Sequence, residues 1–114
     1  MVDTCASADP AKAAAFNRLE KLRDPSHVRA LPLAELKDLF TSAGLAEPQA
    51  SFYELRDEVK NLLARSFPNP GDEAEIIEMF VASVADDRLG IPVGHNGGRL
   101  EYAYPVAILA GRRN

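Results

Sequence analysis

Residues 100–110 read LEYAYPVAILA, and this stretch decides the fold. Side chains along an extended strand alternate between the two faces of a sheet. The even-numbered positions form one apolar face: Leu100, Tyr102, Tyr104, Val106 and Ile108. The odd-numbered positions form a second: Ala103, Ala107 and Leu109. A strand that is apolar on both faces belongs inside a sheet with a covering layer on each side. Because Pro105 cannot donate to a ladder, it predicts a bulge.

Helices and a second strand are predicted before this stretch. Apolar residues recur at helical spacing in four segments: 8–25, 33–45, 56–67 and 72–87. Asp9 suits the N-cap of the first segment, Pro10 its first helical position, and Asp57 the N-cap of the third. Residues 48–54, with adjacent aromatic side chains, predict a strand. Asn96-Gly97 predicts the turn that leads into the closing strand.

All four helices have an apolar face that we expect to be buried, and it is longest in the second and the fourth. The second has the stripe Leu33, Leu36, Leu39, Phe40 and Ala43, followed by Gly44 as a left-handed cap. The fourth has Ile76, Ile77, Phe80, Val81 and Val84. The fold class expected is α+β, with about four helices packed on a small antiparallel sheet and residues 1–114 forming a single domain.

Composition excludes several classes of function. With 13 basic and 17 acidic residues, the net charge is -4, so the chain has no basic surface for nucleic acid. The single cysteine, Cys5, permits no intramolecular disulfide, which suits a reducing compartment. The first residues, MVDTCASADP, do not have the pattern of a signal peptide, and no apolar run is long enough to span a membrane. We therefore expect a soluble, cytoplasmic protein.

The order of these segments resembles the carboxyl-terminal part of class I S-adenosylmethionine-dependent methyltransferases, in particular the ubiquinone/menaquinone-biosynthesis-like, type 11 branch. Three stretches carry the resemblance: RDPSHVR (23–29), the helix that ends AGL (43–45) and AYPVAILAGRR (103–113). The family has a parallel Rossmann-like sheet that ends in a reversed strand. The resemblance makes residues 48–54 the sixth strand, residues 100–110 the antiparallel seventh, and MVD a stub that follows the fifth.

The resemblance implies methyl transfer from S-adenosylmethionine to a small-molecule acceptor. The family holds this cofactor with a glycine-rich loop and an acidic residue, neither of which occurs here; the glycine cluster VGHNGGR (93–99) lacks a strand-loop-helix context. We therefore expect no cofactor-binding residues in this chain, and a substrate-lid region that works only together with a complete cofactor domain. The alternative is a free-standing, non-catalytic, homo-oligomeric binding or assembly module.

Five residues are candidates for substrate binding: Asn17, His27, Arg29, Tyr102 and Tyr104. The resemblance places the first three in the lid and at the mouth of the pocket. The tyrosines begin the reversed strand, at the sheet edge where ligands of open α/β sheets bind. Four of these candidates also have a structural interpretation. The histidine can anchor a turn, the asparagine can belong to a solvated face, and the tyrosines can pack in a core.

No metal site is expected, because His27, His95 and Cys5 share no short motif. VGHNGGR forms either an anion-binding nest or a plain hairpin loop. A homodimer is expected, since the closing strand without its fifth-strand neighbour presents an open edge. Pro105 and the arginines 112–113 are the features that would oppose such pairing.

Overall fold

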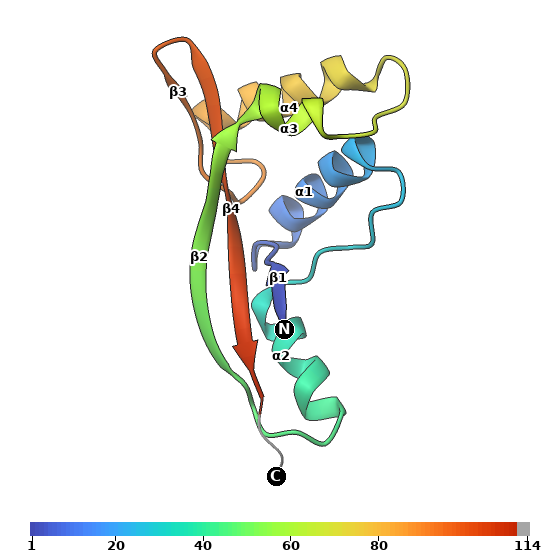
Figure 1. The fold of residues 1–114 in the computed structure, drawn as a ribbon, viewed down its shortest axis with the longest axis vertical. Helices are drawn as coiled ribbons and strands as arrows, with labels where there is room; N and C mark the ends of the chain where they lie inside the picture. The colour runs from blue at the N-terminus through green and yellow to red at the C-terminus, as the bar shows by residue number, and fades with distance from the viewer. Residues whose placement is uncertain (112–114) are drawn as a thin grey trace.

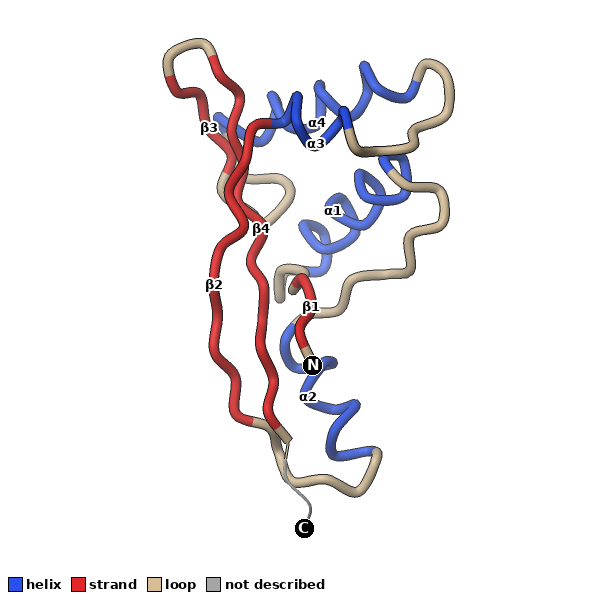
Figure 2. The backbone as a smooth tube through the Cα atoms, in the orientation of Figure 1, coloured by secondary structure: helices blue, strands red, loops and turns tan. Residues whose placement is uncertain are grey.

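The computed structural model describes residues 1–111. In the view of Figures 1 and 2, strands β2 and β4 form a long ribbon, and the helices lie mainly to its right. Arg112 and Arg113 lie outside the described residues. The elements are β1 (Val2–Thr4), α1 (Pro10–Arg23), α2 (Leu33–Ser42), β2 (Gln49–Glu58), α3 (Val59–Ala64), α4 (Asp72–Ala85), β3 (Val93–Asn96) and β4 (Arg99–Ala110). The predicted class, four helices on a small antiparallel sheet, is confirmed.

Strand β4 is the centre of the sheet. It pairs antiparallel with β2 from Gln49 opposite Ala110 to Glu58 opposite Glu101. On its other edge, β1 pairs with residues 106–108 and β3 with residues 99–102. The Ala103 N–H, which donates to Pro92 at 3.0 Å, extends the β3 pairing by one residue. The open edge predicted for this strand is therefore wrong: β4 has neighbours along both sides.

Pro105 does not produce the predicted bulge. The register of β4 with β2 continues through Glu54 opposite Pro105 without an inserted residue. Its carbonyl faces the other edge and accepts from the Cys5 N–H at 2.9 Å, just beyond the end of β1. The missing donor of the proline thus faces the junction between β1 and β3, where it leaves the pairing with β2 intact.

The strand order β1–β4–β2 places a reversed strand between two strands that run parallel to each other, because each is antiparallel to β4. β2 continues four residues beyond its predicted end, since residues 55–58 pair with Tyr104–Glu101. Helix α3 consequently starts at Val59, and Glu58 instead of Asp57 is its N-cap residue. The Asp57 carboxylate still accepts from the Glu58 N–H at 2.7 Å.

Both faces of β4 are covered, as its sequence predicts. A large cluster, which includes Phe16, Leu19, Phe80, Tyr102 and Tyr104, packs α1 and α4 against one face. A smaller cluster packs α2 against the other: Cys5, Leu36, Ala107 and Leu109. The Asp9 carboxylate caps α1 as predicted, accepting from the Ala11 N–H at 2.9 Å.

Five residues expected in the core are exposed: Leu39, Ala43, Ile77, Val81 and Ile108. Each lies on an apolar stripe that its partner covers only in part. On α2, Leu36 is buried while Leu39, one turn on, is 49% exposed. On α4, the buried row is Ile76, Phe80 and Ser83. A hydrophobic stripe thus identifies the apolar face of a helix or strand, but it does not predict how much of that face a neighbouring element buries.

The turn between β3 and β4 is a two-residue hairpin loop made by Gly97 and Gly98, one residue later than predicted. Both have positive φ angles, 56° and 84°, which are the backbone conformations that a tight hairpin of this kind needs. The glycine cluster therefore forms a hairpin between two strands.

Leu36→Ala is expected to lower the free energy of unfolding by about 2–4 kcal/mol, because Leu36 is 1% exposed and the change leaves a cavity. The matched control on the same helix is Leu39→Ala, expected to change it by less than about 0.5 kcal/mol. Urea unfolding of both variants measures this. Equal losses would show that the buried face of α2 is wrongly assigned.

Candidate functional site

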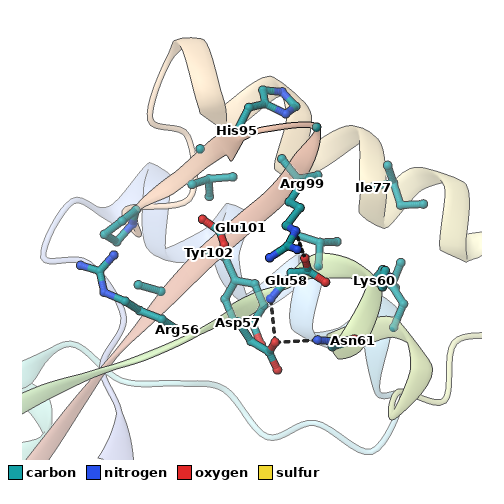
Figure 3. Close-up of a pocket in the computed structure, with 18 of the residues that line it drawn as sticks. Arg56, Asp57, Glu58, Lys60, Asn61, Ile77, His95, Arg99, Glu101 and Tyr102 are labelled. Carbon is teal, nitrogen blue, oxygen red and sulfur yellow. Dashed lines mark hydrogen bonds and ion pairs between the residues drawn. The ribbon is translucent and has the colours of Figure 1, made fainter.

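A depression of about 1400 Å³ lies at the end of the sheet where β2 stops and β4 starts (Figure 3). Helices α3 and α4 and the β3–β4 hairpin contribute its walls. Polar residues on its lining include Arg56, Asp57, Glu58, Lys60, His95 and Arg99. The parallel strands β1 and β2 both run toward this end of β4. Ligands of open α/β sheets bind at the carboxyl ends of the parallel strands.

Two carboxylates of the depression, Asp57 and Glu58, are held in ion pairs. Arg99 contacts Glu58 at 3.1 Å, and Arg65 contacts Asp57 at 3.0 Å. The hydrogen bond from the Asn61 side chain, then those from the Glu58 N–H and Arg65, lower the pKa of Asp57. A carboxylate with a lowered pKa is a weaker base than usual. Asp57 is therefore suited to holding α3 on the end of β2 and poorly suited to removing a proton.

Tyr102 and Tyr104 stand side by side, with ring centroids 4.8 Å apart. The Arg65 guanidinium donates to the Tyr102 hydroxyl at 3.1 Å. Burial raises the pKa of Tyr102, and the charge of Arg65 opposes that change. Burial raises the pKa of Tyr104 much further, and the negative charge of Glu20 adds to it. Both hydroxyls thus stay protonated near neutral pH.

Among the described residues, the buried Tyr104 hydroxyl has no partner at good hydrogen-bonding geometry, although the Glu20 carboxylate is close enough to contribute to the raised pKa of Tyr104. Most buried polar atoms in proteins have a hydrogen-bond partner, so such an atom calls for an explanation. Its ring packs edge-on against Phe16 at 5.4 Å, which fixes the side chain in the core. The core interpretation of this residue holds for its ring, whereas its hydroxyl lacks the well-aligned hydrogen bond that a buried tyrosine usually makes.

Glu20 is a buried carboxylate that the sequence did not single out. The Arg23 Nε donates to it at 2.5 Å. Burial acts to lower the pKa of Arg23, but the hydrogen bond and charge of Glu20 raise it above its ordinary value. Arg23 also accepts through its carbonyl from the Phe67 N–H at 2.9 Å, which ties the end of α1 to the segment after α3. The sequence did contain a signal for the burial of Glu20. It follows Phe16 by one helical turn, so both residues lie on the same face of α1.

Asn17 and His27, predicted separately, lie together. The Asn17 Oδ1 lies 3.0 Å from the His27 Nε2 and accepts from the Ala30 N–H at 2.6 Å. Its amide nitrogen donates to the carbonyls of Ala13 and Ala30 at 3.0 and 3.1 Å. Asn17 therefore fixes the segment after α1 to that helix, and His27 contributes to the same anchor.

Arg29 has a different partner from Asn17 and His27. It is exposed and forms an ion pair with Glu35 at 3.2 Å. The structure thus brings the five predicted residues together as two pairs, Asn17 with His27 and Tyr102 with Tyr104, and leaves Arg29 on the surface.

Cys5 is buried under α2. Burial, and then the negative charge of Asp3, raises the pKa of its thiol, which disfavours the reactive thiolate. No group of three or more possible metal ligands occurs within residues 1–111. None of the helices in that range is both long and apolar enough to cross a bilayer.

The comparisons with known proteins place this geometry in context. No family model matches the chain. The uncharacterized methyltransferase YcgJ of Bacillus subtilis (strain 168) is 27% identical over 113 residues, which cover 97% of this chain and 45% of that protein. Its crystal structure matches the fold with a TM-score of 0.82, over 99% of this chain and 49% of that one. The chain is similar in sequence and fold to part of a methyltransferase.

A protein of Bacillus halodurans C-125 assigned to the methyltransferases has the same fold, with a TM-score of 0.82 at 18% identity, over 98% of this chain and 53% of its own. The chain thus spans about half the length of the relatives that it matches. The resemblance to part of a methyltransferase, predicted from the sequence, is confirmed. The reversed strand between two parallel ones agrees with the carboxyl-terminal part of that fold.

Tyr104→Phe is expected to leave the free energy of unfolding unchanged or raise it by up to about 1 kcal/mol, because the hydroxyl removed is buried without a well-aligned partner. Tyr102→Phe, the matched control, loses the bond to Arg65 and is expected to cost about 0.5–1.5 kcal/mol. Thermal and urea unfolding measure both. A larger loss for Tyr104→Phe than for Tyr102→Phe would mean that the Tyr104 hydroxyl has a partner.

Proposed function

We propose that this chain supplies the substrate lid and the closing strands of an S-adenosylmethionine-dependent methyltransferase. Methyl transfer then takes place only when these elements are joined to a cofactor-binding part. The observation that carries the proposal is the match to about half of YcgJ in both sequence and fold. The cytoplasmic location stays a prediction.

Residues 1–111 do not fit S-adenosylmethionine by themselves. The segment between β1 and α1 reads CASAD and contains no glycine. The carboxylate of Asp9 already caps the start of α1, so this helix end is not free to hold an anionic group. The glycines with positive φ angles, residues 44, 71, 90, 97 and 98, lie outside any strand-loop-helix turn. We therefore assign no step of the transfer itself to these residues.

In this proposal, the chain covers and orients the methyl acceptor. Helices α1, α3 and α4 pack together over the start of β4 (Figure 1). Asn17 and His27 shape the segment that joins α1 to α2, and Arg29 adds an exposed charge beside them. Tyr104 is the stronger candidate of the two tyrosines, since its hydroxyl is protonated and has no well-aligned hydrogen-bond partner within residues 1–111. A small molecule suits such a cap better than nucleic acid does, because the net charge is -4.

The sheet provides a place for the cofactor-binding part. β1 lies at one end of the strand order, and its outer side has no strand partner within residues 1–111. The sheet face beside it is also partly open, since Ile108, opposite Val2, is 40% exposed. A larger parallel sheet that continued from β1 would satisfy that edge and cover this apolar side chain.

The alternative, a free-standing, non-catalytic, homo-oligomeric binding or assembly module, is favoured by one observation. β2 is exposed along its length at the other end of the sheet, which is the usual place for strand pairing between chains. The two functions differ in what they require: the methyltransferase needs a cofactor-binding part, whereas the assembly module needs only copies of itself.

The chain alone is expected not to bind S-adenosylmethionine, because residues 1–111 lack the glycine-rich turn that would hold it. Isothermal titration with the chain at tens of micromolar should give only heats of dilution. Saturable binding with micromolar affinity would contradict this prediction.

A chimera tests the positive part of the proposal. In it, this chain replaces the half of YcgJ that it matches, and truncated YcgJ without that half is the control. The chimera is expected to bind S-adenosylmethionine about as tightly as intact YcgJ. A chimera that unfolds cooperatively, yet neither binds the cofactor nor differs from the truncated control, would overturn the proposal.

A further inference from the structure

The outer edge of β2 is a row of backbone donors and acceptors that has no strand partner within residues 1–111; of its N–H groups, that of Glu58 donates to the Asp57 carboxylate. On β4, the Ala103 and Leu109 N–H groups donate to Pro92 and Met1, so its odd-numbered backbone groups face β1 and β3. Its even-numbered groups therefore face β2, where their partners are odd-numbered residues such as Tyr53 and Leu55. The backbone groups of the even-numbered β2 residues consequently point outward: Ala50, Phe52, Glu54, Arg56 and Glu58.

The outer edge of β2 is only partly protected against pairing with another chain. The strand has ten residues, with no proline and no bulge in its register with β4. Phe52 is 58% exposed, Leu55 is 55% exposed and Tyr53 is 44% exposed. A long edge strand with exposed apolar side chains and without a proline or a bulge is a template for pairing with another chain. Charged side chains, which can oppose such pairing, are present at Glu54, Arg56, Asp57 and Glu58.

The charges of β2 are arranged symmetrically about Leu55. Glu54 and Arg56 flank it, lie on the same face of the strand and pair with each other within one chain. If β2 meets an antiparallel copy of itself with Leu55 opposite Leu55, Glu54 of each copy lies opposite Arg56 of the other. Each acidic side chain then lies opposite a basic one across the interface. The backbone N–H and C=O groups of Glu54 in each copy also face those of Arg56 in the other, so that they can form the hydrogen bonds of an antiparallel pair.

We propose that two copies of this chain pair antiparallel through β2, with Leu55 on the two-fold axis, and so form one continuous sheet. The neighbouring registers are less favourable. In one, Glu54 faces Glu54 of the other copy, and in the opposite shift Arg56 faces Arg56. Like charges directly opposite each other destabilise a strand pair. A two-fold interface needs a surface that is complementary to itself, and the order Glu-Leu-Arg has this property.

This pairing is independent of the proposed methyl transfer. β1 and β2 lie at opposite ends of the strand order, so a cofactor-binding part that continues from β1 leaves the outer edge of β2 free. The dimer expected from the sequence is thus assigned to β2, after β4 is found to be paired on both edges.

The interface is tested by reversing the charges at positions 54 and 56. Sedimentation equilibrium with the chain at 1–100 micromolar measures the dissociation constant of the dimer for each variant. Arg56→Glu and Glu54→Arg each place like charges in both cross-strand pairs and are expected to weaken dimerisation by about tenfold or more. The double variant, with both substitutions, restores opposite charges and is expected to return the dissociation constant to within about threefold of the unmodified chain. Arg88→Glu, a charge reversal at an exposed residue outside β2, is the matched control and should leave it unchanged.

Circular dichroism establishes that each variant is folded before its mass is interpreted. If one single variant does not fold, the other single variant and the double variant give the same comparison. A monomer of the unmodified chain at 100 micromolar would overturn the proposal. So would a dimer that both single variants leave intact, because the interface would then lie elsewhere, and so would a double variant that stays as weak as the single ones.

Discussion

Strand β4 has neighbouring elements on both of its edges and on both of its faces, and the other elements are arranged around it. A strand inside a protein needs partners for its backbone groups along both edges and for its apolar side chains on both faces. β2 takes one edge, and β1 and β3 share the other. Helices α1 and α4 cover one face, and α2 covers the second. Removing any of these elements would expose part of β4, so the fold depends on all of them together.

The same constraint places the candidate site. Because β4 starts where β2 ends, the helices that cover its first half must also close over that end of the sheet. The tyrosines of β4 therefore point into the packed cap. Glu20 with Arg23, and Arg65 with Asp57, supply polar contacts around them. The result is a packed cap with a polar depression beside it.

The sequence patterns predicted the features that depend on residues close together in the sequence. The Asp9-Pro10 start of α1, the Gly44 cap and the two-sided apolar strand are of this kind. Features that depend on distant partners were missed. Residues 55–58 resemble a helix start but are held extended by β4. The three-residue β1 is too short to have a pattern, and its pairing removes the open edge expected for β4. Asn17 and His27 meet only because the segment between them turns back on α1.

Amide hydrogen exchange tests the central place of β4 most directly. The chain is measured at low micromolar concentration, where strand pairing between copies is minimal. We predict that the Ala103 and Leu109 amides, which face β3 and the start of the chain, exchange as slowly as those of Tyr104 and Val106, which face β2. The outward amides of β2, such as Phe52, should exchange much faster. Fast exchange at Ala103 and Leu109, with slow exchange at Tyr104 and Val106, would show that β4 has an open edge and would contradict the account.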